Sequence, residues 1–80
     1  MTYTIILFGI TKEIVGKSSI NVDLAEQTSV AQLMSELKQQ YPALQTLKSL
    51  AVAVNSEYAE ADLRLQAGDE IALIPPVSGG

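Results

Sequence analysis

The sequence contains neither cysteine nor histidine, and this limits how so short a chain can hold one shape. Disulfides are excluded, and so are metal sites built from thiolate or imidazole ligands. A chain of 80 residues forms one domain, and a domain of this size buries only about 60% of the surface that its unfolded form exposes. Because 48% of the residues are hydrophobic, we expect an apolar core to hold the fold by itself.

The composition also excludes several kinds of function. Catalytic triads and Cys–His pairs need residues that this chain lacks, and no pair of carboxylates has a spacing that requires an acid–base role. A formal charge of −4 argues against nucleic-acid binding, which needs a basic face. No apolar run reaches the length of a membrane span, and no secretory signal is visible. We therefore predict a cytoplasmic protein that binds neither nucleic acid nor membrane.

Two strands are predicted near the N-terminus. The stretch MTYTIILFG has apolar residues on both faces of a strand, with Ile6 and Phe8 opposite Ile5 and Leu7. The stretch SSINVDLA alternates apolar and polar residues, as in a strand with one buried face. The residues between them form a loop or a short helical turn, and so short a connection predicts antiparallel neighbours.

One segment has the spacing of an amphipathic helix. Its apolar residues fall on one face: Val30, Leu33, Met34, Leu37 and Tyr41. Ser29, followed three residues later by Gln32, fits a capping box, and Thr28 is the alternative N-cap. Pro42 ends the helix at or before Tyr41, and the residues after it are expected to be irregular.

Three later segments complete the predicted sheet. The stretch LAVAVN alternates larger residues with two alanines, and we expect the helix to pack closely on the alanine face. A short strand and a turn at Gly68 and Asp69 follow. The stretch EIALIP is a strand with apolar residues on both faces, like the first strand.

This order of elements predicts an α+β fold of two layers, in which one main helix covers one face of a mixed sheet of four or five strands. The first and last strands are apolar on both faces, so both are expected at the centre. If they lie side by side and parallel, the fold is the β-grasp, or ubiquitin-like, fold. We assign residues 1–74 to this domain and residues 75–80 to a flexible C-terminal tail.

The segment from Ala53 to Gly80 contains three motifs in order: AVN, L-x-x-GDE and a terminal PPVSGG. In identity and spacing they resemble the small sulfur-carrier subunits of molybdopterin synthase, the MoaD type of ubiquitin-like protein. The resemblance covers essentially the whole chain. The stretch ILFGITKEIVG also fits a pattern of this family, although Lys12 stands where an arginine is more usual.

The resemblance implies that the chain carries sulfur on its own C-terminus. In such proteins an activating enzyme uses ATP to adenylate the terminal carboxylate, here that of Gly80. A sulfur-relay protein supplies the sulfur for a thiocarboxylate, and the tail then enters the active site of a large subunit. The large subunit forms the dithiolene of molybdopterin, typically in an assembly of two small and two large chains. The chain is then not an enzyme on its own and binds no cofactor.

The tail has side chains that suit this chemistry. Gly79 and Gly80 lack a Cβ, so the backbone can approach a partner's reactive centre closely. The two prolines fix φ and lack N–H donors, which favours an extended arm. The residues expected to position the tail are Pro75, Pro76, Val77 and Ser78.

The resemblance also implies an apolar patch near the root of the tail that meets the partners. The residues at these positions are Phe8, Tyr58 and Ile74. The alternative that they are simply core residues stays open at this point.

Three other functions share these features. Related carriers supply sulfur for thiamin, for cysteine-type biosynthesis or for tRNA thiolation, although the thiamin carriers tend to be shorter and to lack PPVSGG. A ubiquitin-like modifier would join Gly80 to lysines. A plain interaction module would end in Gly-Gly by coincidence.

Overall fold

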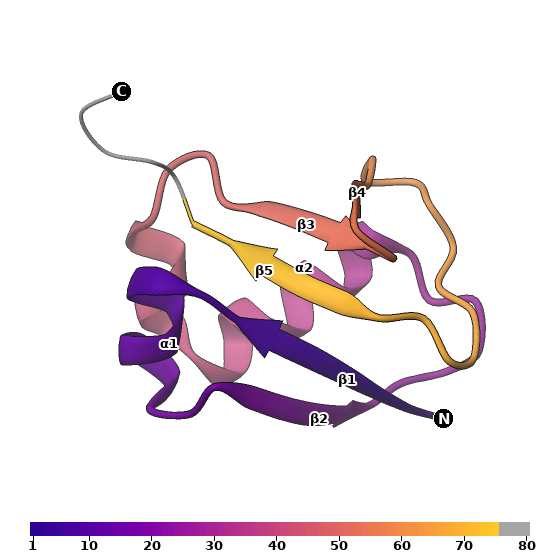
Figure 1. Cartoon of the computed structure of the whole chain (residues 1–80), viewed down its shortest axis with the longest axis horizontal. Coiled ribbons are helices and arrows are strands. Elements are labelled where there is room, and N and C mark those ends of the chain that lie inside the picture. The colour runs from indigo at the N-terminus through magenta and orange to yellow at the C-terminus, as the bar shows by residue number, and fades with distance from the viewer. Residues whose placement is uncertain (76–80) are drawn as a thin grey trace.

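The computed structural model describes residues 1–75, so the predicted tail residues Pro76, Val77, Ser78, Gly79 and Gly80 lie outside the described part. The described elements are, in chain order, β1 (Thr2–Leu7), α1 (Gly9–Val15), β2 (Ser19–Asp23), α2 (Val30–Gln40), the 3₁₀ helix η1 (Pro42–Thr46), β3 (Ala51–Val54), β4 (Glu57–Tyr58) and β5 (Ile71–Ile74). The strands form one sheet in the order β2-β1-β5-β3-β4. α2 lies across one face of this sheet (Figure 1).

The two central strands are β1 and β5, which pair in parallel, while the other three pairings are antiparallel. Ile5 lies opposite Ile71, and Leu7 lies opposite Leu73. All four side chains are 0–3% exposed. The predicted β-grasp topology, with an antiparallel β1–β2 hairpin and a parallel central pair, is confirmed.

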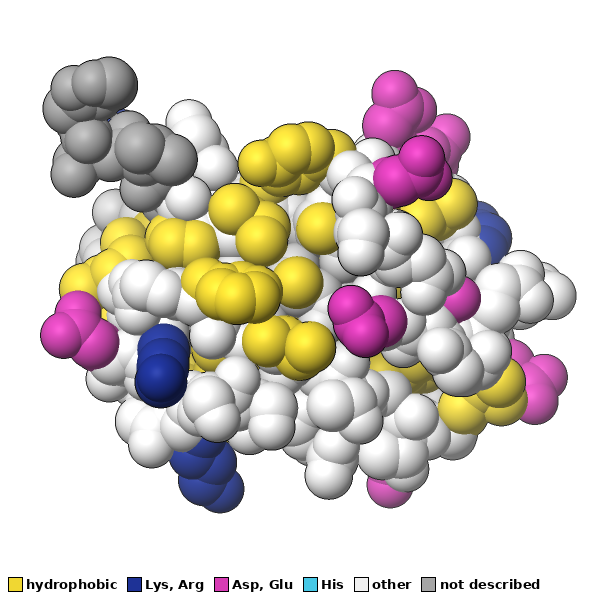
Figure 2. Space-filling model, in the orientation of Figure 1, with side chains coloured by type: hydrophobic (Ala, Val, Ile, Leu, Met, Phe, Trp, Pro, Cys, Tyr) yellow, Lys and Arg dark blue, Asp and Glu magenta, His cyan; other side chains and the backbone are white. Residues whose placement is uncertain are grey.

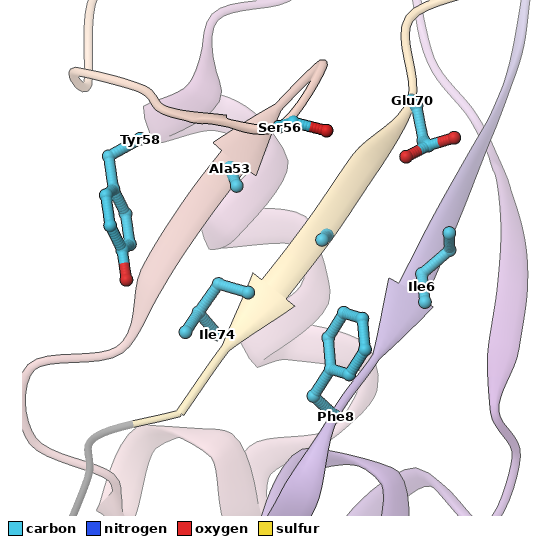
Figure 3. A pocket seen from close by; sticks show the side chains of 8 residues that line it. Ile6, Phe8, Ala53, Ser56, Tyr58, Glu70 and Ile74 are labelled. Carbon is cyan, nitrogen blue, oxygen red and sulfur yellow. The ribbon is translucent and has the colours of Figure 1, made fainter.

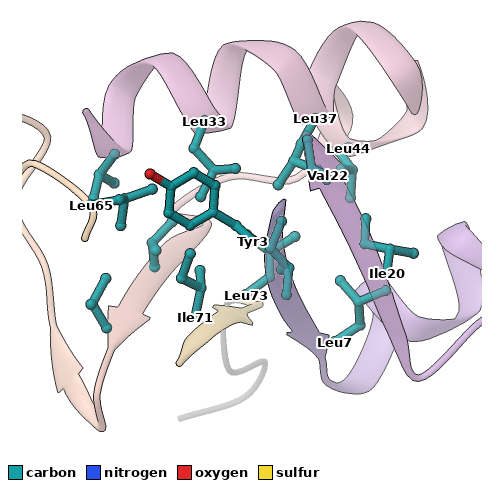
Figure 4. Packing of buried hydrophobic residues seen from close by; sticks show 14 residues of the cluster. Tyr3, Leu7, Ile20, Val22, Leu33, Leu37, Leu44, Leu65, Ile71 and Leu73 are labelled. Carbon is teal, nitrogen blue, oxygen red and sulfur yellow. The ribbon is translucent and has the colours of Figure 1, made fainter. Parts of the chain in front are cut away.

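The core lies between the sheet and α2 (Figure 4). Leu33 and Leu37 of α2 are fully buried against residues of the central strands, as the helical spacing predicts. Ser29 accepts a hydrogen bond from the backbone N–H of Gln32, and the Gln32 side chain accepts one from the backbone N–H of Ser29. The predicted capping box is therefore present. α2 ends at Gln40, before Pro42, also as predicted.

The prediction that α2 packs on the alanine face of β3 is wrong. Val52 and Val54, which are 4% and 7% exposed, belong to the core under α2. Ala53 points to the opposite face, which α2 does not cover (Figure 3). The space between sheet and helix needs larger side chains to fill it. The alanines leave the other face of the sheet shallow.

Two segments are more regular than the sequence predicts. Residues 9–15 form two turns of helix rather than a loop or a single turn, and α1 ends at Gly16, whose φ is +83°. Residues 42–46 form η1, which begins at Pro42. Proline suits the start of a helix, because the N–H groups of the first turn have no hydrogen-bond partner within the helix.

Phe8 lies just after β1 rather than inside it, as the residue that precedes α1. The fully buried Thr11 holds its backbone: the Phe8 N–H donates to Thr11 Oγ1 at 3.1 Å, and the Thr11 hydroxyl donates to the Phe8 carbonyl.

The AVN and GDE motifs meet in space. Asn55, with φ +54°, donates its backbone N–H to the Glu70 carbonyl at 2.7 Å. Its side-chain oxygen accepts from the Glu70 N–H, and its side-chain nitrogen donates to Asp69 Oδ1, both at 3.0 Å. Asp69 also accepts from the Gln66 N–H at 2.7 Å. These residues therefore join the β3–β4 turn to the start of β5.

We expect Asn55→Ala to lower the free energy of unfolding by about 2 kcal/mol, because two side-chain bonds are lost and alanine disfavours a positive φ. Asn55→Gly loses the same bonds but accepts this φ, so it should be less destabilising. Urea denaturation of both variants measures the difference. An alanine variant as stable as the wild type would show that these bonds do not hold the turn.

Candidate functional site

The face of the sheet that α2 leaves uncovered contains an apolar hollow of about 300 Å³. Figure 3 shows its side chains arising from β1, β3, β4 and β5 and the turns beside them. The residues that line it are Ile6, Phe8, Ala53, Ser56, Tyr58, Glu70, Ala72 and Ile74.

One row of residues across four strands runs through the hollow, from Ile6 on β1 to Tyr58 on β4. Ala72 of β5 lies opposite both Ile6 and Ala53, and Ala53 lies opposite Tyr58. The strand neighbours of Ile6, Ala53 and Ala72 belong to the core. Because side chains alternate along a strand, these three residues face away from the core. The side chains of the two alanines at the centre of this row are short, and larger side chains surround them, so the surface is hollowed at the alanines.

Phe8 and Tyr58 stand at the edge of the hollow and are 48% and 77% exposed, whereas Ile74 is half-buried. The structure thus brings the three predicted patch residues to one surface (Figure 3). The alternative that Phe8 and Tyr58 are core residues is wrong. That this surface binds a partner stays a prediction.

The apolar surface ends toward β2 and the N-terminal half of β1. Thr4 donates its hydroxyl to the Asn21 side chain at 2.9 Å, and Thr2 donates to Asp23 at 2.6 Å. These exposed polar pairs occupy the same face as Ile6 but nearer the N-terminus of β1. Figure 2 shows hydrophobic side chains gathered over the middle of this face. The apolar surface is therefore confined to the region toward the C-terminal end of β5.

The root of the tail lies at the edge of this surface. β5 ends at Ile74, which lines the hollow, and Pro75 follows directly. Pro75 packs against Gly9, since a Cβ added to Gly9 would lie 3.1 Å from the Pro75 Cγ. Gly9 also has φ +54°, which favours glycine. Because Gly9 follows Phe8, the edge of the hollow and the start of the tail are held side by side.

The sequence profile of the ThiS family matches residues 5–80. The chain belongs to the ThiS family. It is 43% identical to a Dictyostelium discoideum protein named molybdopterin synthase sulfur carrier subunit, over 98% of this chain and 95% of that one. A human protein of the same name is 36% identical over 95% of this chain and 91% of its own.

Solved structures of similar fold support the β-grasp assignment for this ThiS-family chain. The crystal structure of SAMP1 from Haloferax volcanii superposes with a TM-score of 0.85 at 30% identity, covering all of both chains. Subunit 1 of the molybdopterin-converting factor from Helicobacter pylori, solved with subunit 2, gives a TM-score of 0.69 at 23% identity and full coverage of both chains. The second likeness shows the fold alone.

Several residues of the hollow were not predicted as site residues. Ile6, Ala53 and Ala72 could have been found, because strands that are apolar on both faces must expose one face or cover it with a second layer. Glu70 gave no such signal, since the sequence indicates only a solvated carboxylate. Of the described residues that line the hollow, Glu70 alone is charged.

The described residues form a shallow apolar surface around Ala53 and Ala72. They contain no group of three or more acidic side chains placed to hold a metal ion. No helix among residues 1–75 is both long and apolar enough to cross a membrane. The hollow is shallow and apolar, which is typical of a surface that meets another protein.

Substituting Gly9 with alanine tests the contact with Pro75. Gly9→Ala imposes both an unfavourable φ and a close contact, so we expect it to lower the free energy of unfolding by about 2 kcal/mol. The matched control is Gly16→Ala, where φ is also positive but no atom of residues 1–75 is found within 4 Å of the added Cβ. This substitution should lower the free energy of unfolding by about 1 kcal/mol. If thermal denaturation showed that both variants lose the same free energy of unfolding, a specific Gly9–Pro75 contact would be contradicted.

Proposed function

We propose that this chain is the sulfur-carrier small subunit of a molybdopterin synthase and donates sulfur from a thiocarboxylate at Gly80. The observation that carries this proposal is the apolar hollow that ends where Pro75 leaves the sheet. A partner that covers the hollow is thereby placed beside the start of the PPVSGG tail. The relatives named as sulfur carrier subunits of this enzyme support the same function.

The chemistry requires activation because a carboxylate has no good leaving group. In the proposed sequence, the Gly80 carboxylate attacks the α-phosphate of ATP and pyrophosphate leaves. A persulfide on the relay protein then attacks the acyl carbon of the adenylate and AMP leaves, which gives an acyl disulfide between the two proteins. A thiol reductant cleaves the S–S bond of this acyl disulfide and is itself oxidised to a disulfide with the relay protein, which leaves the thiocarboxylate on Gly80. ATP is bound by the activating enzyme. The chain itself supplies only its main-chain carboxyl group, so it needs no cysteine.

The large subunit is the proposed acceptor of the sulfur. From Pro75 to Gly80 an extended chain reaches at most about 20 Å, enough to cross a partner's surface into a pocket. Each thiocarboxylate carries one sulfur and a dithiolene contains two, so two loaded chains are consumed for each product. We propose an assembly of two small and two large chains in the cytoplasm, with sulfurtransfer activity in the whole synthase.

A ubiquitin-like modifier is the second candidate function. The observation that favours it is the 30% identity to SAMP1 from Haloferax volcanii; a second crystal structure names a protein of that organism small archaeal modifier protein 1. In this function the activated Gly80 carbonyl would form an amide with a lysine amino group instead of accepting sulfur.

Mass spectrometry separates the two functions. The chain is incubated with ATP, the activating enzyme and the sulfur-relay protein, with and without a lysine-containing acceptor. A carrier gains the mass change of one oxygen replaced by sulfur at its C-terminus, whereas a modifier forms lysine adducts. An added residue after Gly80 should abolish the sulfur product without changing thermal stability. An extended chain that still restored molybdoenzyme activity in cells would contradict the carrier proposal.

Partner binding by the hollow gives a separate prediction. Phe8→Ala and Tyr58→Ala should each weaken binding to the large subunit about tenfold or more, because exposed aromatic residues often dominate interface energy. Leu63→Ala is the matched control, since Leu63 is 41% exposed but lies outside the hollow. Isothermal titration calorimetry measures the three dissociation constants. Equal affinities for all three variants would exclude the hollow as the docking surface.

A further inference from the structure

Glu70 occupies an unusual position on the apolar face. It follows the turn at Gly68 and Asp69, directly before β5, and its side chain is exposed at the end of the hollow (Figure 3). The other end of β5 leads to Pro75. Five residue steps at about 3.3 Å separate the two positions, so they lie about 16 Å apart along the strand.

The backbone of Glu70 is fixed, but its carboxylate is not engaged by the residues that the structure describes. Asn55 accepts from the Glu70 N–H at 3.0 Å and donates to its carbonyl at 2.7 Å. Within residues 1–75, the hydrogen bonds found for Glu70 are these two backbone bonds. The structure therefore places a carboxylate firmly at the border of an apolar surface.

A partner that covers the hollow must also compensate the negative charge of Glu70. An apolar partner surface would strip water from the carboxylate without replacing its hydrogen bonds, which disfavours docking. A lysine or arginine on the partner would instead form a charge-assisted contact. Figure 2 shows acidic side chains along this side of the apolar surface. The local charge thus favours a partner with a basic edge.

We propose that Glu70 is a specificity-determining contact that pairs with a lysine or arginine on the docking surface of the large subunit. This inference rests on the proposed function. The pair lies at the end of the hollow opposite to Pro75, so it fixes the direction in which the partner docks and hence where the tail enters. Glu70 also disfavours the binding of proteins that present only an apolar surface, because docking would leave the Glu70 carboxylate unpaired.

The test compares Glu70→Gln with Glu36→Gln, which removes the same charge from an exposed position on α2, on the other side of the sheet. The dissociation constant for the large subunit is measured at low and high salt. We expect Glu70→Gln to weaken binding at least tenfold at low salt and to reduce the salt dependence. Glu36→Gln should match the wild type. Glu70→Asp keeps the charge and should retain the salt dependence.

The outcomes separate this inference from the proposed function. If the wild type binds the large subunit and Glu70→Gln binds equally well with the same salt dependence, the Glu70 contact is excluded while the carrier function stands. If Glu70→Gln and Glu36→Gln weaken binding equally, the effect is one of net charge, and the specific contact is again excluded. If the wild type does not bind the large subunit, both proposals fail. Thermal denaturation of each variant checks that it is folded.

Discussion

β1 and β5 lie side by side and parallel at the centre of the sheet, although they come from opposite ends of the chain. Their inward side chains, which include Ile5 and Ile71, are buried under α2. Their outward side chains, which include Ile6 and Ala72, line the hollow. A central strand pair with apolar residues on both faces therefore creates the core and the exposed apolar surface together. The end of β5 also sets where the tail begins.

A small domain without disulfides has few ways to remain folded and still expose apolar surface. Here two alanines keep the middle of the exposed face shallow, and the larger side chains of Phe8 and Ile74 lie near the start of the tail. Polar pairs such as Thr4 and Asn21 cover the rest of that face. The AVN and GDE motifs hold the β3–β4 turn against the start of β5. They act on the site by positioning Glu70.

Much of this structure follows from the sequence because local signals and burial agree. The spacing of Leu33 and Leu37 predicted α2, Ser29 and Gln32 predicted its start, and the strands with two apolar faces predicted the central pair. The face of β3 could not be assigned, because alternation alone does not say which side the helix covers. Glu70 was missed for a similar reason: its neighbours in the hollow come from strands distant in sequence. The roles of residues 76–80 stay predictions.

We propose that the uncovered face of the sheet, and not the α2 side, meets the large subunit. Methyl NMR tests it directly, by comparing the chain alone with its complex with the large subunit. The methyl signals of Ile6, Ala72 and Ile74 should shift on binding, while those of Ala31 and Met34 on α2 should not. Shifts confined to the α2 methyls, with the hollow unchanged, would contradict the account.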